Sequence, residues 1–126
     1  MSVWWSALAV ASGAVLGALS RWAVGMWLNP VWSGFPVGTL AVNLVGGLAA
    51  GALMVYLSRE PNEALRLVLV TGVLGALTTF STFSVESLTL IERGRPGLAL
   101  AHTLTHVLGA LACAAAGARL MRAYLA

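Results

Sequence analysis

Four long apolar stretches make up most of the chain and constrain its fold more than any other feature. They span residues 3–28, 37–57, 64–91 and 97–118 of the 126-residue sequence. Each is close to or longer than the roughly 20 residues that an α-helix needs to cross the hydrocarbon core of a bilayer. The sequence therefore predicts an all-α integral membrane protein with four transmembrane helices.

The composition agrees with a membrane environment. Hydrophobic residues form 60% of the chain and charged residues 9%, whereas about 25% of the residues in a typical soluble domain are charged. The lipid bilayer is thus an expected partner, and the inner (plasma) membrane of the cell the expected location. The seven cationic residues are all arginines, spread over helix ends and short loops, so they form no basic stripe that would indicate nucleic-acid binding.

Three short connectors join the expected helices. They cover residues 29–36, 58–62 and 92–96, and each contains proline. Because short connectors make consecutive helices antiparallel, both termini are expected on the same side of the membrane. No linker or internal repeat divides the sequence, so residues 1–126 are expected to form a single transmembrane domain.

The arginines favour neither side of the membrane clearly. Four fall on the expected side of the termini and three on the opposite side (Arg59, Arg66, Arg119 and Arg122 against Arg21, Arg93 and Arg95). An uneven count normally sets the orientation of a membrane protein. One interpretation is insertion in both orientations and assembly as an antiparallel, dual-topology dimer. The alternative is one orientation set by other factors.

A pathway through so short a chain is expected to lie between subunits, because four packed helices close around their own side chains. A homodimer is the simplest such assembly. Small residues four positions apart let helix backbones approach closely. Gly13 with Gly17, and Gly47 with Gly51, are such pairs, and they suit packing within one subunit as well as packing between two.

The third apolar stretch is unusually polar near its centre. One or two hydroxyls in a membrane helix can bond to a backbone carbonyl one turn earlier, but dense polarity inside a membrane is typical of an ion or substrate pathway. Five hydroxyl residues fall within seven positions: Thr78, Thr79, Ser81, Thr82 and Ser84. We therefore expect this helix to line an ion-conducting pathway.

The same helix is expected to break in mid-membrane. If it begins near Arg66, Gly75 lies about 14 Å along its axis, near the middle of a core about 30 Å thick. Gly72 and Gly75, followed by β-branched Thr78 and Thr79, disfavour a continuous helix. The prediction is a break at residues 75–78; a kinked helix is the alternative. A break frees carbonyls to bind a cation and amides to face an anion.

Three other residues suggest how an anion would be solvated. Phe80 and Phe83 are three residues apart and so share a helix face. Aromatic rings have partly positive edges, which can face an anion without a fixed charge that would trap it. Asn43 in the second helix adds an amide with two donors; an interhelical hydrogen bond is its alternative role.

Three segments resemble motifs of the Fluc, or CrcB, family of fluoride channels. Residues 78–84, Thr-Thr-Phe-Ser-Thr-Phe-Ser, preceded by Gly-Val-Leu-Gly at 72–75, resemble the family signature. Residues 35–46 resemble its second-helix motif, and residues 13–21 its first-helix motif. The three motifs occur in the family's order, so the resemblance covers nearly the whole chain.

The resemblance implies an antiparallel, dual-topology dimer that exports fluoride passively through two pores. It also implies a central structural Na+ held by main-chain carbonyls of Gly75 and Thr78 from both subunits. The implied anion pathway contains Phe80, Phe83, Asn43, Thr79, Ser81, Thr82 and Ser84. Arg21 and Glu86 match the family's motifs without an assigned role. Where the family tends to place tyrosine and serine on the fourth helix, this chain has His102, Thr103, Thr105 and His106.

Two rival interpretations concern ionisable residues. A proton-coupled small multidrug exporter has the same size and topology but needs a carboxylate within the membrane, and Glu86 lies past the expected midplane. His102, His106 and Cys113 fall near one helix face, where packing or pore lining is favoured over a zinc site.

No nucleophile, base and orienting group recur at catalytic spacing, so the chain is not expected to be an enzyme. Selectivity for fluoride over other anions rests on the resemblance alone.

Overall fold

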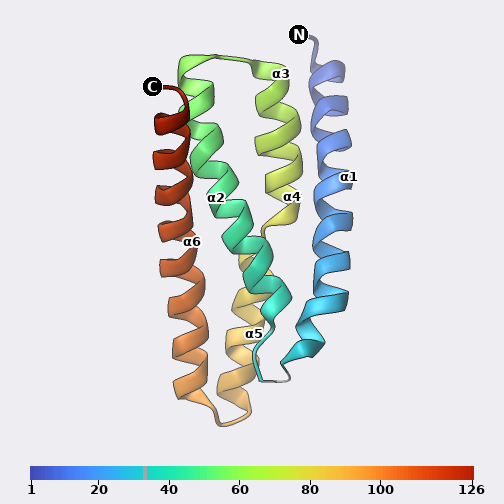
Figure 1. Ribbon diagram of the computed structural model, residues 1–126. Coiled ribbons are helices and arrows are strands. Elements are labelled where there is room, and N and C mark those ends of the chain that lie inside the picture. Colours follow the sequence, from blue (N-terminus) through green and yellow to red (C-terminus); the bar gives the residue numbers. More distant parts are fainter. Residues whose placement is uncertain (33) are drawn as a thin grey trace.

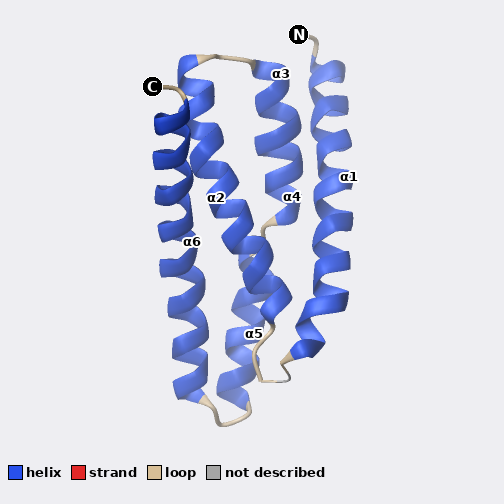
Figure 2. Ribbon diagram, viewed as in Figure 1, coloured by secondary structure: helices blue, strands red, loops and turns tan. Residues whose placement is uncertain are grey.

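A computed structural model describes residues 1–32 and 34–126, and their regular elements are all helical (Figures 1 and 2). Four helical stretches are long and apolar enough to cross a membrane: Val3–Val31, Val37–Arg59, Glu63–Glu92 and Pro96–Tyr124. The prediction of an all-α, four-span membrane protein is confirmed. Ser33, which belongs to the first expected connector, lies outside the described residues.

Three of the four spans are almost uninterrupted helices. Helix α1 covers Val3–Leu28 and continues into the 3-10 turn η1, Asn29–Val31. Helix α2 covers Val37–Arg59, and helix α6 covers Pro96–Tyr124. The expected end of the last helix at residue 118 is too early, because the residues that follow are mostly good helix formers. Arg122 also lies in the last turn, where a cation is favoured by the helix dipole.

The third span consists of four segments. Helix α3, Glu63–Leu65, leads into the π-helical segment η2, Arg66–Leu74, and into helix α4, Gly75–Leu77. Thr78 and Thr79 are extended, with φ/ψ of −82°/154° and −151°/115°. Helix α5 then covers Phe80–Glu92.

Gly75 itself is helical, with φ −60° and ψ −33°. The extended residues therefore begin at Thr78, later than the start of the predicted segment 75–78. The reason is that hydrogen bonds between side chains and the backbone near Thr79, described below, determine where the helix is interrupted. The flexibility of the glycines does not.

Glycine residues allow the four spans to pack closely in two pairs, α1 with the third span and α2 with α6. A Cβ atom on Gly13 would collide with the Val68 carbonyl of η2, and one on Gly17 with the Val73 carbonyl. A Cβ on Gly51 of α2 would collide with the Ala114 carbonyl of α6. Helix α1 thus packs on the third span and α2 packs on α6, with backbones in direct contact. The glycine pairs serve packing within one subunit, so they give no support to an oligomer.

The outer surface of the bundle is apolar. Large side chains on every span are exposed, among them Trp22, Met54, Phe80 and Leu111. No span buries more than 28% of its most apolar window inside the subunit. Lipid or another subunit must cover the rest. Both termini lie at the same end of the bundle (Figure 1), as expected from the short connectors.

Candidate functional site

The extended backbone at Thr79 is held by the side chain of Asn43 in α2. The Thr79 N–H donates to Asn43 Oδ1 at 2.8 Å, and Asn43 Nδ2 donates to the Thr79 carbonyl at 3.0 Å. One side-chain amide therefore satisfies both polar groups of one residue that has left the helix, which a buried backbone requires. The interhelical alternative for Asn43 is what the structure contains.

Four carbonyls, those of residues 75–78, lose their usual helical donors at this point. In a continuous α-helix the Thr79 N–H would donate to the Gly75 carbonyl, and the Thr82 N–H to the Thr78 carbonyl. Here the first N–H donates to Asn43, and the second donates to Thr79 Oγ1 at 3.2 Å. Thr79 is thereby the N-cap of α5. The predicted cation ligands Gly75 and Thr78 are two of these four residues; the carbonyls of Ala76 and Leu77 likewise have no backbone donor among the described residues.

The five hydroxyls of residues 78–84 fall into two groups. Thr79 Oγ1 lies 3.4 Å from Ser81 Oγ and donates to Thr82 Oγ1 at 3.0 Å, so these three cluster at the start of α5. Thr78 Oγ1 donates to the Leu74 carbonyl at 2.9 Å, and Ser84 Oγ to the Phe80 carbonyl at 2.8 Å. Only the first group gathers polar atoms in one place.

The two phenylalanines of α5 lie in different surroundings. Their ring centroids are 5.0 Å apart and the rings are edge to face at 81°. Phe83 is 6% exposed and stacks on His106 of α6 at 4.8 Å, whereas Phe80 is 76% exposed. The shared face that the sequence predicts is confirmed by this contact, but only Phe83 points into the subunit.

Two cavities flank Thr79. One has a volume of about 570 Å³ and is lined by residues that include Asn43, Gly75, Thr78, Phe80, Phe83 and His106. The other has a volume of about 410 Å³ and is lined by residues that include Arg21, Asn29, Thr39 and Thr82. Thr79 lines both cavities. Thr79, a residue with extended backbone, thus lies between two pockets that are both open to the surface of the subunit.

A second polar group joins α2, α5 and α6 beyond the interruption. His102 is fully buried; its Nε2 lies 3.2 Å from Glu86 Oε2 and its Nδ1 lies 2.7 Å from Ser87 Oγ. The Thr39 hydroxyl donates to the other oxygen of Glu86. Sequence reasoning left Glu86 without a role. The signal available for it was an ionisable residue within a membrane span.

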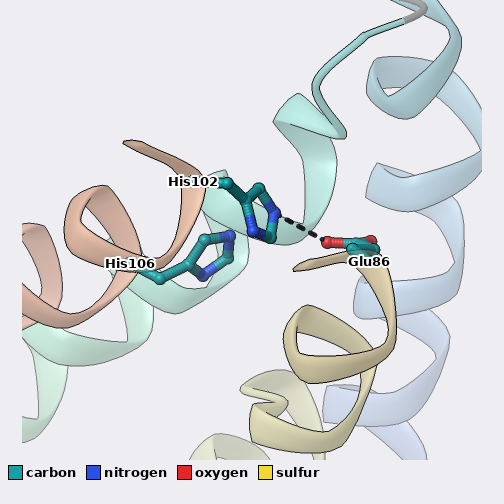
Figure 3. Close-up of side chains that lie close together, drawn as sticks. All are labelled: Glu86, His102 and His106. Atoms are coloured by element: carbon teal, nitrogen blue, oxygen red, sulfur yellow. Dashed lines mark hydrogen bonds and ion pairs between the residues drawn. The ribbon is translucent and has the colours of Figure 1, made fainter. Parts of the chain in front are cut away.

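His106 completes this region. Its Nδ1 lies 3.0 Å from Asn43 Nδ2, so the ring is in contact with the residue that holds Thr79. Glu86, His102 and His106 each offer a ligand atom, and these atoms lie within 4.8 Å of one another. Figure 3 shows the two rings of α6 side by side, with Glu86 facing His102. Both histidines are buried, and the residue that lies with them in this cluster is Glu86 of α5, not Cys113 of their own helix.

Four spans, one of which contains the extended residues Thr78 and Thr79 beside buried polar groups, define a multi-pass membrane protein of the channel or transporter class. The family model described as CrcB-like protein, Camphor Resistance (CrcB), matches residues 8–118. The chain therefore belongs to the CrcB family, and the resemblance noted from its motifs is confirmed.

Similar proteins carry the name fluoride-specific ion channel FluC. The relative from Marinobacter nauticus is 47% identical over 91% of this chain and 93% of its own length. The relative from Aromatoleum aromaticum is 51% identical over 82% of this chain and 81% of its own length. The relative from Pseudomonas aeruginosa is 50% identical over 86% of this chain and 87% of its own length. These relatives are named as ion channels, which agrees with the expectation that the chain is not an enzyme.

Proposed function

We propose that this protein is a fluoride channel that lets fluoride leave the cell passively through the inner (plasma) membrane. Its relatives' name supports the chemical identity of the ion. The observation in this chain that carries the proposal is the extended backbone at Thr78 and Thr79, because Thr79 lies between two surface-open pockets of an otherwise apolar bundle. Released backbone at membrane depth is tolerated where it lines a cavity or ion pathway.

The proposed channel is an antiparallel, dual-topology homodimer with a pathway at the subunit boundary. The exposure of Phe80 supports this, because its ring contacts buried Phe83 and lines the same cavity while its other side is uncovered. A second copy would cover it and complete the cavity wall. The nearly even distribution of arginines between the two ends of the bundle is also compatible with insertion both ways.

A structural Na+ is proposed at the interruption, held by the carbonyls of Gly75 and Thr78 from both subunits. The fit is supported by the loss of helical donors at both carbonyls, to Asn43 and to Thr79 Oγ1, although the carbonyls of Ala76 and Leu77 between them are released too. Unwound carbonyls in broken membrane helices are suited to Na+. The ion would supply positive charge that neutralises these oxygens and ties the two subunits together.

Fluoride is proposed to pass along Phe80 and Phe83 and the hydroxyls at the start of α5. Ring edges are partly positive, and the hydroxyls of Ser81 and Thr82 can donate to an anion. The first turn of α5, where Thr79 is the cap, also presents the positive end of the helix dipole. Asn43 contributes by holding the backbone of Thr79 in place. Ser84 lies one turn after Phe80, and its hydroxyl donates to the Phe80 carbonyl.

Flux from liposomes tests this function. Purified protein would be reconstituted in vesicles loaded with potassium fluoride, and efflux would be followed with a fluoride electrode after adding a potassium ionophore. The expected result is rapid efflux that requires the ionophore, with chloride excluded. Efflux that requires a proton gradient and accepts organic cations would instead identify a proton-coupled multidrug exporter.

Two further measurements test the assembly. Ala126→Cys in a Cys113→Ser background, labelled in cells with an impermeant thiol reagent, should react for about half of the molecules if insertion is dual. All-or-none labelling would contradict dual topology. Replacing Na+ by a large organic cation should lower flux and weaken dimerisation; unchanged flux and assembly would contradict the Na+ site.

A further inference from the structure

A groove between α2 and α6 leads to two arginines at the end of the bundle that holds both termini. Its volume is about 420 Å³, and its lining includes Met54 of α2 and Leu111, Ala115, Arg119 and Arg122 of α6. The two helices pack against each other here, where α6 approaches its C-terminal end (Figure 1). All lining residues except the arginines are apolar. The groove therefore suits an occupant with an apolar body and an anionic end.

A second open groove borders the same arginine on a neighbouring face of α6. Its volume is about 480 Å³, and it is lined by Ala112, Ala115, Ala116, Arg119 and Leu120. Ala115 and Arg119 line both grooves, so the two adjoin along α6. A glycerophospholipid has two acyl chains joined below one phosphate. Two adjoining apolar grooves that share an arginine match this shape.

The arginines lie at the depth of lipid phosphates. His106 contacts Asn43, which holds the interruption, so its level marks the middle of the membrane expected from the sequence. Arg119 follows 13 residues later on the same helix, about 20 Å along its axis. Half of the hydrocarbon core is about 15 Å thick, so Arg119 lies among the headgroups. Side chains of a helix lean toward its N-terminus, which directs Arg122 back toward the same level.

Both arginines are available to a ligand. They are exposed, and neither makes an ion pair or a side-chain hydrogen bond with any residue that the structure describes. By contrast, Arg66 at the same end of the bundle lies 3.9 Å from Glu63. Arg119 and Arg122 are three residues apart and so lie on one side of the helix. Arginine binds phosphate strongly, often through two parallel hydrogen bonds.

A second copy of the chain is the competing occupant, but its charges do not match. An antiparallel copy would bring the opposite end of its bundle alongside, which carries Arg93 and Arg95 against Glu92. A parallel copy would bring another Arg119 and Arg122. Positive charge would meet positive charge in either case, and such contacts are unfavourable. A lipid phosphate is complementary to this end of the groove.

We propose that Arg119 and Arg122 bind the phosphate of an anionic phospholipid whose acyl chains lie in the two adjoining grooves. The site goes beyond the proposed transport function, because no residue of the proposed ion pathway lines either groove. An anionic headgroup is favoured because basic residues at the membrane surface attract acidic lipids. In the proposed antiparallel dimer, each leaflet would contain one such site.

Lipid titration followed by native mass spectrometry tests the site. Wild-type protein should bind phosphatidylglycerol at least tenfold more tightly than phosphatidylcholine. Arg119→Gln/Arg122→Gln should remove this preference. Arg93→Gln/Arg95→Gln is the matched control, because it loses the same charge at the opposite end and should keep the preference. Ala115→Phe fills both grooves without a change of charge and should weaken phosphatidylglycerol binding at least fivefold.

Four outcomes would overturn the lipid site. They are equal affinity of the wild type for both lipids, equal loss in the two double arginine variants, full binding in Ala115→Phe, and competition by glycerol phosphate as effective as that by the whole lipid. Loss of the dimer in Arg119→Gln/Arg122→Gln on size-exclusion chromatography would also overturn it and assign this face to a second copy. A wild type that binds the lipid as expected but does not conduct fluoride would overturn the channel function alone.

Discussion

The two halves of the bundle are held together in different ways. In the half that contains both termini, which we call the terminal half, helices meet through glycine against backbone: Gly13 against Val68 and Gly51 against Ala114. In the half beyond the interruption, which we call the α5 half, Gly38 also meets the backbone of α1, but side-chain hydrogen bonds are added, as in the contacts of Glu86 with His102 and Thr39. Asn43 and Thr79 lie where the two arrangements join.

The difference indicates a division of labour. Backbone contact between helices in lipid depends on close packing and leaves no polar side chain available to a ligand. Hydrogen-bonded side chains inside a membrane are costly to place there and are typically kept for function. We therefore expect substitutions in the terminal half to act on folding, and substitutions in the α5 half to act on transport more than on folding.

The largest expected effect is a loss of folding in the terminal half. Gly51→Val would drive side-chain atoms into the Ala114 carbonyl of α6, which is main chain and cannot rotate away. Overpacking typically costs about 1–3 kcal/mol, and we expect the upper end of this range or more. Thermal unfolding in detergent measures it. Gly97→Ala, where nothing lies within 4 Å of an added Cβ, is the control and should keep full stability.

A smaller loss of stability, with a complete loss of transport, is expected at the junction. Asn43→Leu keeps the volume but leaves the buried N–H of Thr79 unpaired, at about 1–3 kcal/mol. The Thr79 carbonyl keeps a partner, because the carbonyl of an N-cap residue accepts the first bond of its helix. Fluoride flux should fall to background. Asn62→Ala is the control, because Asn62 also accepts a backbone N–H, that of Leu65, but at the exposed start of α3. Wild-type flux in Asn43→Leu would show that the extended conformation of Thr79 is not needed.

The two phenylalanines of α5 allow effects on folding and effects on transport to be compared within one helix. Phe83→Ile should lower flux at least tenfold and also destabilise, by about 1–2 kcal/mol, because the ring is buried against His106. Phe80→Ile should lower flux by a similar factor without changing the stability of the subunit, because its ring is exposed. Efflux and thermal unfolding measured on the same preparations separate these effects. Full flux in both variants would rule out the proposed pathway along the two phenylalanines.

The sequence predicted the spans because apolar length alone identifies a helix in lipid. It located the interruption only approximately, because the cause lies elsewhere in the chain. Glycine propensity suggested the neighbourhood of Gly72 and Gly75, yet a Cβ on Gly72 would come within 2.7 Å of the Val10 carbonyl, so this glycine serves packing. The extended residue is instead selected by Asn43, on another helix.

The partners of the polar and aromatic residues could not be predicted from the sequence either, because they too lie on other helices. The hydroxyls of residues 78–84 could be read as a group, since they are neighbours in sequence. The pairing of Glu86 with His102, and of Phe83 with His106, depends on how α5 and α6 pack. No periodicity within one helix carries that information. Cys113 shares a helix face with the two histidines in the sequence, but the residue that lies with them is Glu86 of α5.

The smallest expected effect concerns a single hydroxyl of the α5 half. Thr39→Val preserves shape but removes the donor to Glu86, and a typical intramolecular hydrogen bond contributes about 0.5–1.5 kcal/mol. We expect about 1 kcal/mol, because Glu86 keeps its contact with His102. Thr105→Val, whose hydroxyl is exposed, should change thermal stability by no more than about 0.5 kcal/mol. Equal stability of the two variants would mean that the polar contacts of the α5 half do not hold it together, and that its helices depend on packing as the terminal half does.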